Sequence, residues 1–191
     1  MSHIATDNLG GGRVAGEAMI EALGEAGGKV IVLDFKSAES CLLRVQGFKE
    51  IISAYNAKNP DSKIDIVMEL PGEGAKDRSL KATEDAIQAH SDLVGIFAIN
   101  DLSALGARAA LEKAGIADQV KIIGFDGQPE GKQAIKDGKI YADPVQFPDL
   151  IGRKTMETIL AYLKGEEIEP VILIPTQLYR QSDGLADPEL N

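Results

Sequence analysis

A cation, an amide, an aromatic ring and a carboxylate lie at or shortly after the ends of apolar runs in this sequence: Arg44, Asn100, Phe125 and Asp126. A carboxylate accepts hydrogen bonds from two hydroxyl groups, an amide both donates and accepts, and a guanidinium donates two parallel bonds. If the apolar runs are neighbouring parallel strands, their carboxyl ends meet at one edge of a sheet, where ligands bind. The four residues together predict a site for a neutral ligand rich in hydroxyl groups.

Each of these residues also has a purely structural interpretation. Asn100, or Asp101 after it, could cap the helix that follows. Asp126 could be a turn residue ahead of the next helix, and Arg44 could be a solvated helix residue. Phe125 could belong to the core. The convergence of four such positions on one edge is what favours a ligand site.

The elements that would bring these residues together alternate between strands and helices. Continuous apolar runs are typical of parallel strands covered on both faces, and they predict strands at residues 29–35, 63–70, 94–99 and 120–125. Helical stripes between and after them are predicted at Phe48, Ile51, Ile52 and Tyr55, at Leu80, Thr83 and Ile87, and at Leu102, Leu105 and Ala109. This alternation implies right-handed crossovers, so we predict an α/β fold with a doubly wound parallel sheet.

The last third of the chain departs from this alternation. Residues 139–146 (KIYADPVQ) indicate a strand interrupted by Pro144, and Pro148 stands at the first position of a predicted helix. That helix carries a strong apolar stripe, formed by Met156, Ile159, Leu160 and Leu163. The segment PVILIPTQLYR predicts two short strands, and residues 182–191 (SDGLADPELN) are typical of a frayed tail.

Composition argues against several classes of function. The 191 residues carry a formal net charge of −10. Because no stretch is rich in Lys and Arg, nucleic acid is not an expected partner. No apolar run approaches the roughly 18–20 residues of a membrane span. With a single cysteine, Cys41, and two histidines, neither an intramolecular disulfide nor a zinc site is expected.

One motif would fit a nucleotide cofactor. Gly10, Gly12 and Ala15 match the G-x-G-x-x-A pattern of dinucleotide-binding turns, and Asp34 follows about 20 residues further on. The first glycine of such a turn should follow its strand directly, yet residues 7–9 (DNL) intervene here. An NAD-dependent enzyme is therefore the less favoured interpretation. Since no nucleophile with an adjacent base stands out either, we expect no catalysis.

Five segments, in the right order, resemble the periplasmic ribose-binding-protein family: ATDNLGGGRVAG, SAESCLLRVQGF, AHSDLVGIFAINDLSALGA, IIGFDGQPEGKQAIKDGKI and VQFPDLIGRK. Proteins of this family are the sugar-binding components of bacterial ATP-driven (ABC) importers. The resemblance extends over nearly the whole chain and implies a type I periplasmic-binding-protein lobe. It also implies a monosaccharide ligand, a membrane permease as partner, no cofactor, and a periplasmic or extracytoplasmic location.

Members of that family have two lobes joined by three chain crossings, and the resemblance begins at the first crossing. It implies that residues 1–145 form the second lobe and that residues 146–169 form a crossing and a helix of the first lobe. Residues 170–181 would be the return strands and residues 182–191 a tail. Most of the first lobe, with any signal peptide, is then expected to be missing from this sequence.

The resemblance also implies which residues contact sugar: Arg44, Asn100, Phe125, Asp126 and Gln146. From the residues alone, Gln146 would be a solvated hinge residue. Two positions depart from the family pattern. Gly74 stands where ribose binders place an aromatic side chain, which leaves room for a bulkier or differently held sugar. Pro144 interrupts the hinge strand, and no physical reason for it is evident from the sequence.

Two further expectations follow from the resemblance. Sugar-responsive bacterial repressors use the same two-lobe module behind a helix-turn-helix, so an effector-binding domain is the alternative function. The segment GKIYADPVQFPDLIGRK favours the importer branch.

The helix from Asp149 to Gly165 would lack the sheet that it covers in a complete first lobe. Its apolar stripe is expected to pair with a second copy as a homodimer, the alternative being that it folds back onto its own lobe.

Overall fold

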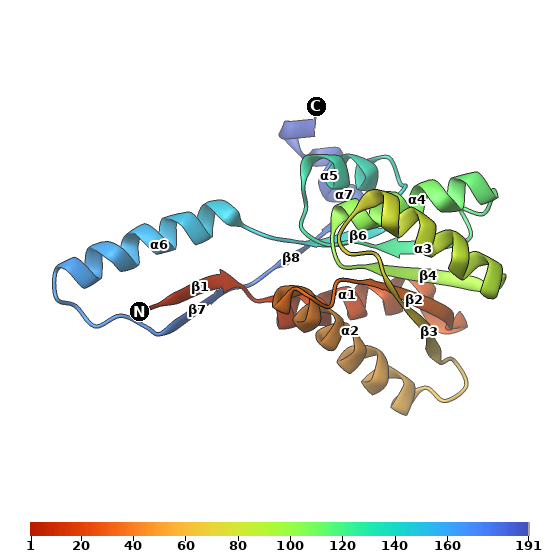
Figure 1. The fold of residues 1–191 in the computed structure, drawn as a ribbon, viewed down its shortest axis with the longest axis horizontal. Helices are drawn as coiled ribbons and strands as arrows, with labels where there is room; N and C mark the ends of the chain where they lie inside the picture. The colour runs from red at the N-terminus through yellow and green to blue at the C-terminus, as the bar shows by residue number, and fades with distance from the viewer. Residues whose placement is uncertain (191) are drawn as a thin grey trace.

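The computed structural model describes residues 1–190 and shows a body from which an arm projects (Figure 1). The strands are β1 (His3–Thr6), β2 (Gly28–Asp34), β3 (Ile64–Pro71), β4 (Leu93–Ala98), β5 (Lys121–Ile123), β6 (Ala142–Val145), β7 (Val171–Ile174) and β8 (Gln177–Arg180). The α-helices are α1 (Asn8–Leu23), α2 (Glu39–Lys58), α3 (Lys76–Ala89), α4 (Asp101–Ala114), α5 (Pro129–Lys136), α6 (Pro148–Leu163) and α7 (Gln181–Ala186). Short 3₁₀ helices are η1 (Gly24–Ala26) and η2 (Pro188–Leu190).

The body is built on a doubly wound sheet with the strand order β3-β2-β4-β5-β6-β8. The first five strands in this order, β3 to β6, all run parallel to one another, and β8 pairs antiparallel with β6 at the edge of the sheet. Helices α1 and α2 cover one face of this sheet, and α3, α4 and α5 cover the other (Figure 1). The predicted α/β fold is confirmed.

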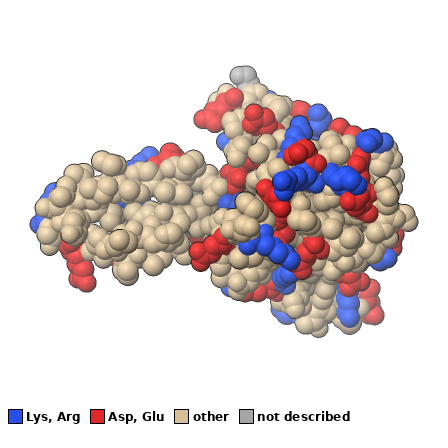
Figure 2. Space-filling model, viewed as in Figure 1, with Lys and Arg blue, Asp and Glu red and all other residues tan. Residues whose placement is uncertain are grey.

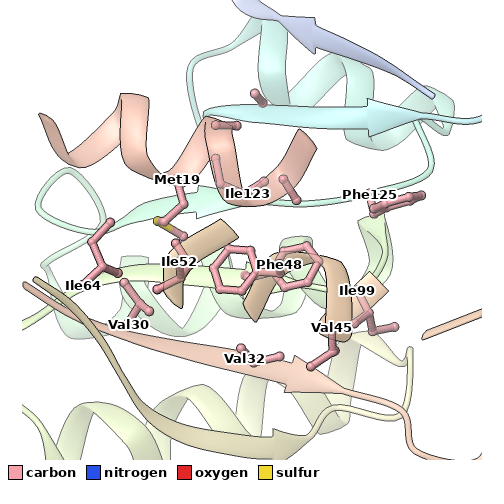
Figure 3. Close-up of a cluster of buried hydrophobic side chains, with 14 of the residues drawn as sticks. Met19, Val30, Val32, Val45, Phe48, Ile52, Ile64, Ile99, Ile123 and Phe125 are labelled. Carbon is pink, nitrogen blue, oxygen red and sulfur yellow. The ribbon is translucent and has the colours of Figure 1, made fainter. Parts of the chain in front are cut away.

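The core lies on both faces of the sheet because successive side chains of a strand point in opposite directions. In β2, Val30 and Val32 pack toward α1 and α2, whereas Ile31 and Leu33 pack toward α3 and α4. On the first face the rings of Phe48 and Phe97 stack with their centroids 4.5 Å apart, and Figure 3 shows Phe48 among its apolar neighbours. Burial on both faces explains why these strands are continuous apolar runs.

The buried face of α4 differs from the predicted stripe. Leu102 is 43% exposed, while small residues such as Ala104 and Ala107 are fully buried. The reason is a close approach of α3, since a Cβ atom at Gly106 would overlap the carbonyl oxygen of Lys76. Small residues must therefore face α3. Of the predicted stripe, Leu105 packs partly against the core, whereas Leu102 does not.

The predicted frayed tail is also wrong for the described part of residues 182–191. Residues 181–186 form α7, whose Gly184 is buried against Lys136 of α5. The hydroxyl of Tyr179 donates to Asp187 at 2.7 Å. Because β8 adds antiparallel to β6, the chain end is carried back alongside α5 and packs there. Asn191 lies outside the described residues.

The arm consists of β1, β7 and α6. β1 pairs in parallel with β7 rather than joining the lobe expected for residues 1–145. The return segment, residues 170–181, likewise divides between the arm (β7) and the body (β8). Pro175 stands between these two strands and has no N–H to continue a ladder, which separates the two sheets there.

Helix α6 begins at Pro148 as predicted, and none of its residues is buried. The side chains of its apolar stripe are 45–73% exposed: Met156, Ile159, Leu160 and Leu163. In Figure 2, charged side chains gather over the body, whereas the visible face of the arm consists mostly of other residues. The arm therefore presents an apolar helix face that the described residues leave uncovered.

Glycines allow α1 and α2 to approach closely at the end of the body that faces the arm. A Cβ atom at Gly12 would overlap the carbonyl oxygen of Arg44, and one at Gly47 would overlap the carbonyl oxygen of Leu9. Both overlaps are with backbone, which cannot rotate away. This contact fixes the turn of α2 that carries Arg44 against the start of α1.

We expect Gly47→Ala to destabilise the protein by about 1–3 kcal/mol, because the added methyl group must push the two helices apart. Gly152→Ala is the matched control, since Gly152 lies within α6 with no atom near the position of a Cβ. Replacing a glycine in a helix with alanine should itself stabilise by roughly 0.5–1 kcal/mol. Urea unfolding of the two variants measures both effects, and equal stabilities would contradict this account of the helix contact.

Candidate functional site

The carboxyl ends of the central strands face the crossings between body and arm. The winding of the sheet reverses between β2 and β4, and ligands of open α/β sheets bind outside the strand ends at such a point. Arg44, in the second turn of α2, projects into this region with only 5% of its surface exposed. A guanidinium so deeply buried requires hydrogen-bond acceptors.

Arg44 finds its acceptors on three separate elements. Its Nε donates to Oδ1 of Asn8 at 2.9 Å, at the start of α1. Its Nη1 donates to the carbonyl oxygen of Ile99 after β4 at 2.6 Å, and to Oδ1 of Asp126 at 2.8 Å. The guanidinium carbon lies 3.8 Å from the centre of the Phe125 ring, a cation–π contact.

Phe125 takes the core position that is the structural interpretation of its place in the sequence. Its ring is fully buried and belongs to the hydrophobic cluster beneath α1 and α2 (Figure 3). The same ring supports Arg44 from below. Phe125 therefore acts through Arg44, which lies over the face of its ring.

Asp126 has an unusual backbone. Its φ is +104°, a region that residues with side chains rarely adopt and that costs of order 1–3 kcal/mol. Hydrogen bonds hold it there: its N–H donates to Pro144 at 3.2 Å, and its carbonyl accepts from the Gln146 N–H at 2.9 Å. Such strain clusters at functional sites, which supports a role for this carboxylate.

The carboxylate of Asp126 is fixed on one side and open on the other. Oδ1 accepts from Arg44 and from Nε2 of Gln146, the latter at 2.6 Å. The side chain is 14% exposed, and Oδ2 has no hydrogen-bond partner among residues 1–190. Burial raises the pKa of this carboxyl, and the Arg44 guanidinium opposes that rise.

Gln146 links Asp126 to the arm. Besides its bond to Asp126, its Oε1 accepts from the hydroxyl of Thr6 at 2.6 Å. Thr6 ends β1 and Gln146 follows β6, so this bond joins two chain crossings side by side. Thr6 and Asn8 were not singled out in the sequence, although Thr6 ends β1 and Asn8 begins α1 two residues later.

Asn100 caps α4, which is the structural interpretation of its position. Its Oδ1 accepts from the Ser103 N–H at 2.9 Å, and its Nδ2 donates to the carbonyl oxygen of Gly74 at 3.1 Å. One connected group, called the rim below, is formed by Arg44, Phe125, Asp126 and Gln146. Asn100 adjoins the rim only through its chain neighbour Ile99, whose carbonyl oxygen accepts from Arg44.

The structure gives the glycine run a different role from dinucleotide binding. Residues 10–12 lie inside the first turns of α1, whose N-cap Asp7 accepts from the Gly10 N–H at 2.9 Å. Gly11 and Gly12 are buried against Phe125 and Arg44.

Among residues 1–190 no cluster of His, Cys, Asp and Glu could hold a metal ion. No described helix is long and apolar enough to cross a membrane.

Comparison with known proteins identifies relatives among sugar importers. The ribose import binding protein of Salmonella typhimurium is 39% identical over 170 residues, which are 88% of this chain and 54% of that protein. The D-apiose import binding protein of Actinobacillus succinogenes is 33% identical over 76% of this chain and 45% of its own length. The chain thus spans about half the length of the curated relatives that it matches.

Solved structures show the same fold. An ABC-transporter solute-binding protein of Actinobacillus succinogenes with bound D-allose superposes with a TM-score of 0.89 at 26% identity, over 98% of this chain and 64% of the other. One of Agrobacterium vitis with bound D-fucose gives 0.84 at 33% identity, over 99% and 63%. The family model for the periplasmic binding protein domain matches residues 1–167. This chain belongs to the periplasmic binding protein domain family.

Proposed function

We propose that this chain supplies the sugar-binding rim of a substrate-binding protein of a bacterial ABC importer. The observation that carries the proposal is the Asp126 carboxylate, fixed through Oδ1 by Arg44 and Gln146 while Oδ2 stays open. The intact protein would act outside the cytoplasm, where it would bind a neutral monosaccharide and deliver it to a membrane permease. No cofactor and no chemical conversion of the sugar are part of this proposal.

The charges of the rim suit a ligand without net charge. Arg44 and Asp126 form an ion pair, so the site has a strong local field but little net charge. Among the described residues Nη2 of Arg44 also lacks a partner, so the ion pair keeps one unused donor group as well as the open acceptor on Asp126. Adjacent sugar hydroxyls both donate and accept, and hydrogen bonds to charged groups contribute about 1.5–3 kcal/mol each.

The names of the relatives support the same ligand class. Curated relatives are import binding proteins for ribose and D-apiose and a D-allose-binding periplasmic protein, and solved neighbours hold D-allose or D-fucose. We propose pentoses and hexoses of this kind as candidates.

We also propose that body and arm belong to different lobes. The chain passes between them at Thr6, at Gln146 and between β7 and β8, and the Thr6–Gln146 bond joins two of these crossings. In this assignment α6 and the β1–β7 pair contribute to the second wall of the cleft. The sugar would lie between that wall and the rim.

Asp126→Ala should weaken monosaccharide binding at least about 100-fold, because it removes charge-assisted hydrogen bonds to sugar. Since this change also strips Arg44 of a partner, Asp126→Asn is the cleaner variant. It keeps the shape and one acceptor but removes the charge, and we expect a loss of at least about 10-fold. Calorimetry on the protein as its gene encodes it measures both.

Asp118→Asn is the control, since this carboxylate is fully exposed in the loop between α4 and β5. Its sugar affinity should equal that of the unaltered protein. Sugar affinity that is unchanged in both Asp126 variants would refute the assignment of the rim, and recovery of a chemically altered sugar would refute the absence of catalysis.

For the 191-residue chain by itself, we propose a homodimer formed through α6. Fully burying a side chain of this stripe contributes roughly 1.5–3 kcal/mol. Light scattering at micromolar concentration should therefore give about twice the monomer mass of 20.3 kDa. Leu160→Glu with Leu163→Glu should restore a monomer, while Lys154→Glu, at an exposed position on the opposite face of α6, should leave the dimer intact. A mass near 20.3 kDa for the unaltered chain would contradict the dimer.

A further inference from the structure

Two carboxyl groups are buried together beneath the rim. Asp101 begins α4 and is 1% exposed, and Asp143 lies in β6 and is fully buried. Both lie on the sheet face covered by α4 and α5. Their oxygens are within hydrogen-bonding reach of each other. Neither residue contacts the open side of Asp126, so the pair is outside the site described above.

The two carboxyl groups are unequally satisfied. Oδ2 of Asp101 accepts from the Gln128 N–H at 2.6 Å. Its Oδ1 and both oxygens of Asp143 have no hydrogen-bond partner among residues 1–190. A fully buried carboxylate without donors is very costly, and two of them in contact more so. One proton between the two groups would give each a partner.

The chain leaves space for this pair. A Cβ atom at Gly131 would overlap Oδ1 of Asp101, and one at Gly124 would overlap Oδ1 of Asp143. Gly131 lies within α5, where glycine is otherwise unfavourable. The two acids therefore occupy a pocket that would be too small if either glycine carried a side chain.

The charged groups around the pair do not neutralise it. Arg44 of α2 favours the charged form of Asp101, whereas Asp126 of the β5–α5 loop disfavours the charged form of Asp143. Tyr179 of β8 stands opposite Asp143 in the sheet register, with Lys132 of α5 over its ring. Burial, and next the neighbouring Asp101, raise the pKa of Asp143 well above its usual value; burial also raises that of Asp101.

We propose that Asp143 shares one proton with Asp101 at neutral pH and thereby acts as a positioning residue for the rim. The shared proton holds Oδ1 of Asp101 while Oδ2 holds the N–H of Gln128, two residues after Asp126. The pair thus anchors the loop in which Asp126 adopts its strained backbone. The effect on ligand binding rests on the proposed function, whereas the shared proton and the anchored loop do not.

Asp143→Asn tests the shared proton. An asparagine can donate to Asp101 as a protonated acid would, but it cannot lose that proton. Because the pKa of Asp143 is raised on folding, the folded protein holds a proton that the unfolded chain releases above about pH 4. The unaltered protein should therefore lose stability as pH rises from there to the raised pKa, and the variant should lack this loss.

The measured quantity is the ratio of the unfolding equilibrium constants of the unaltered protein and of Asp143→Asn, from urea unfolding at pH 4 to 8. It should rise by up to about tenfold per pH unit and then level off. Asp61→Asn, which removes an exposed carboxylate, should give a nearly flat ratio. A flat ratio for Asp143→Asn as well would overturn the proposal.

Two further readouts keep the test decisive if the variant folds poorly. In the unaltered protein, the infrared carbonyl stretch of a buried carboxylic acid should persist at pH 7, and its absence would overturn the shared proton. Amide exchange at Gln128 should accelerate by more than the intrinsic pH dependence of exchange once the pH exceeds the pKa of the pair. If the protection of this amide does not change with pH, the positioning role is overturned. Neither readout needs a sugar, so failure to bind sugar would count against the proposed function alone.

Discussion

The guanidinium of Arg44 is buried at the meeting point of four elements, and its need for acceptors constrains all of them. It bonds to Asn8 at the start of α1, to Ile99 after β4 and to Asp126 after β5. Removing one partner of such a buried ion pair typically costs about 3–5 kcal/mol, because an uncompensated charge remains. The close contact of α1 and α2 at Gly12 and the strained loop at Asp126 are both conditions for this geometry.

The same interaction leaves one oxygen of the Asp126 carboxylate open while the groups around it are bonded to one another. Arg44 and Gln146 occupy one oxygen of Asp126, and the buried acids below anchor the loop at Gln128. Binding groups that are already ordered lose little entropy when a ligand arrives. Since Gln146 also bonds to Thr6, the rim is connected to the crossings that lead into the arm.

Local and periodic features could be predicted from the sequence, and contacts between distant segments could not. Buried strands were recognisable as apolar runs, and Arg44 and Asp126 were found because strand ends converge at one edge. The role of Gln146 depends on Thr6, 140 residues away, and the pairing of Asp143 with Asp101 depends on how β6 lies against α4. The ordered chain end follows from β8 adding to β6, which no local pattern in residues 182–191 indicates.

The central claim is that the open oxygen of Asp126 binds a sugar hydroxyl. The most direct test is a crystal structure of the protein, as its gene encodes it, grown with the monosaccharide that calorimetry shows to bind most tightly. The account predicts a sugar hydroxyl oxygen about 2.5–3.0 Å from Oδ2 of Asp126, with Arg44 still bonded to Oδ1. A sugar bound elsewhere, with neither Asp126 nor Arg44 in contact with it, would contradict the account.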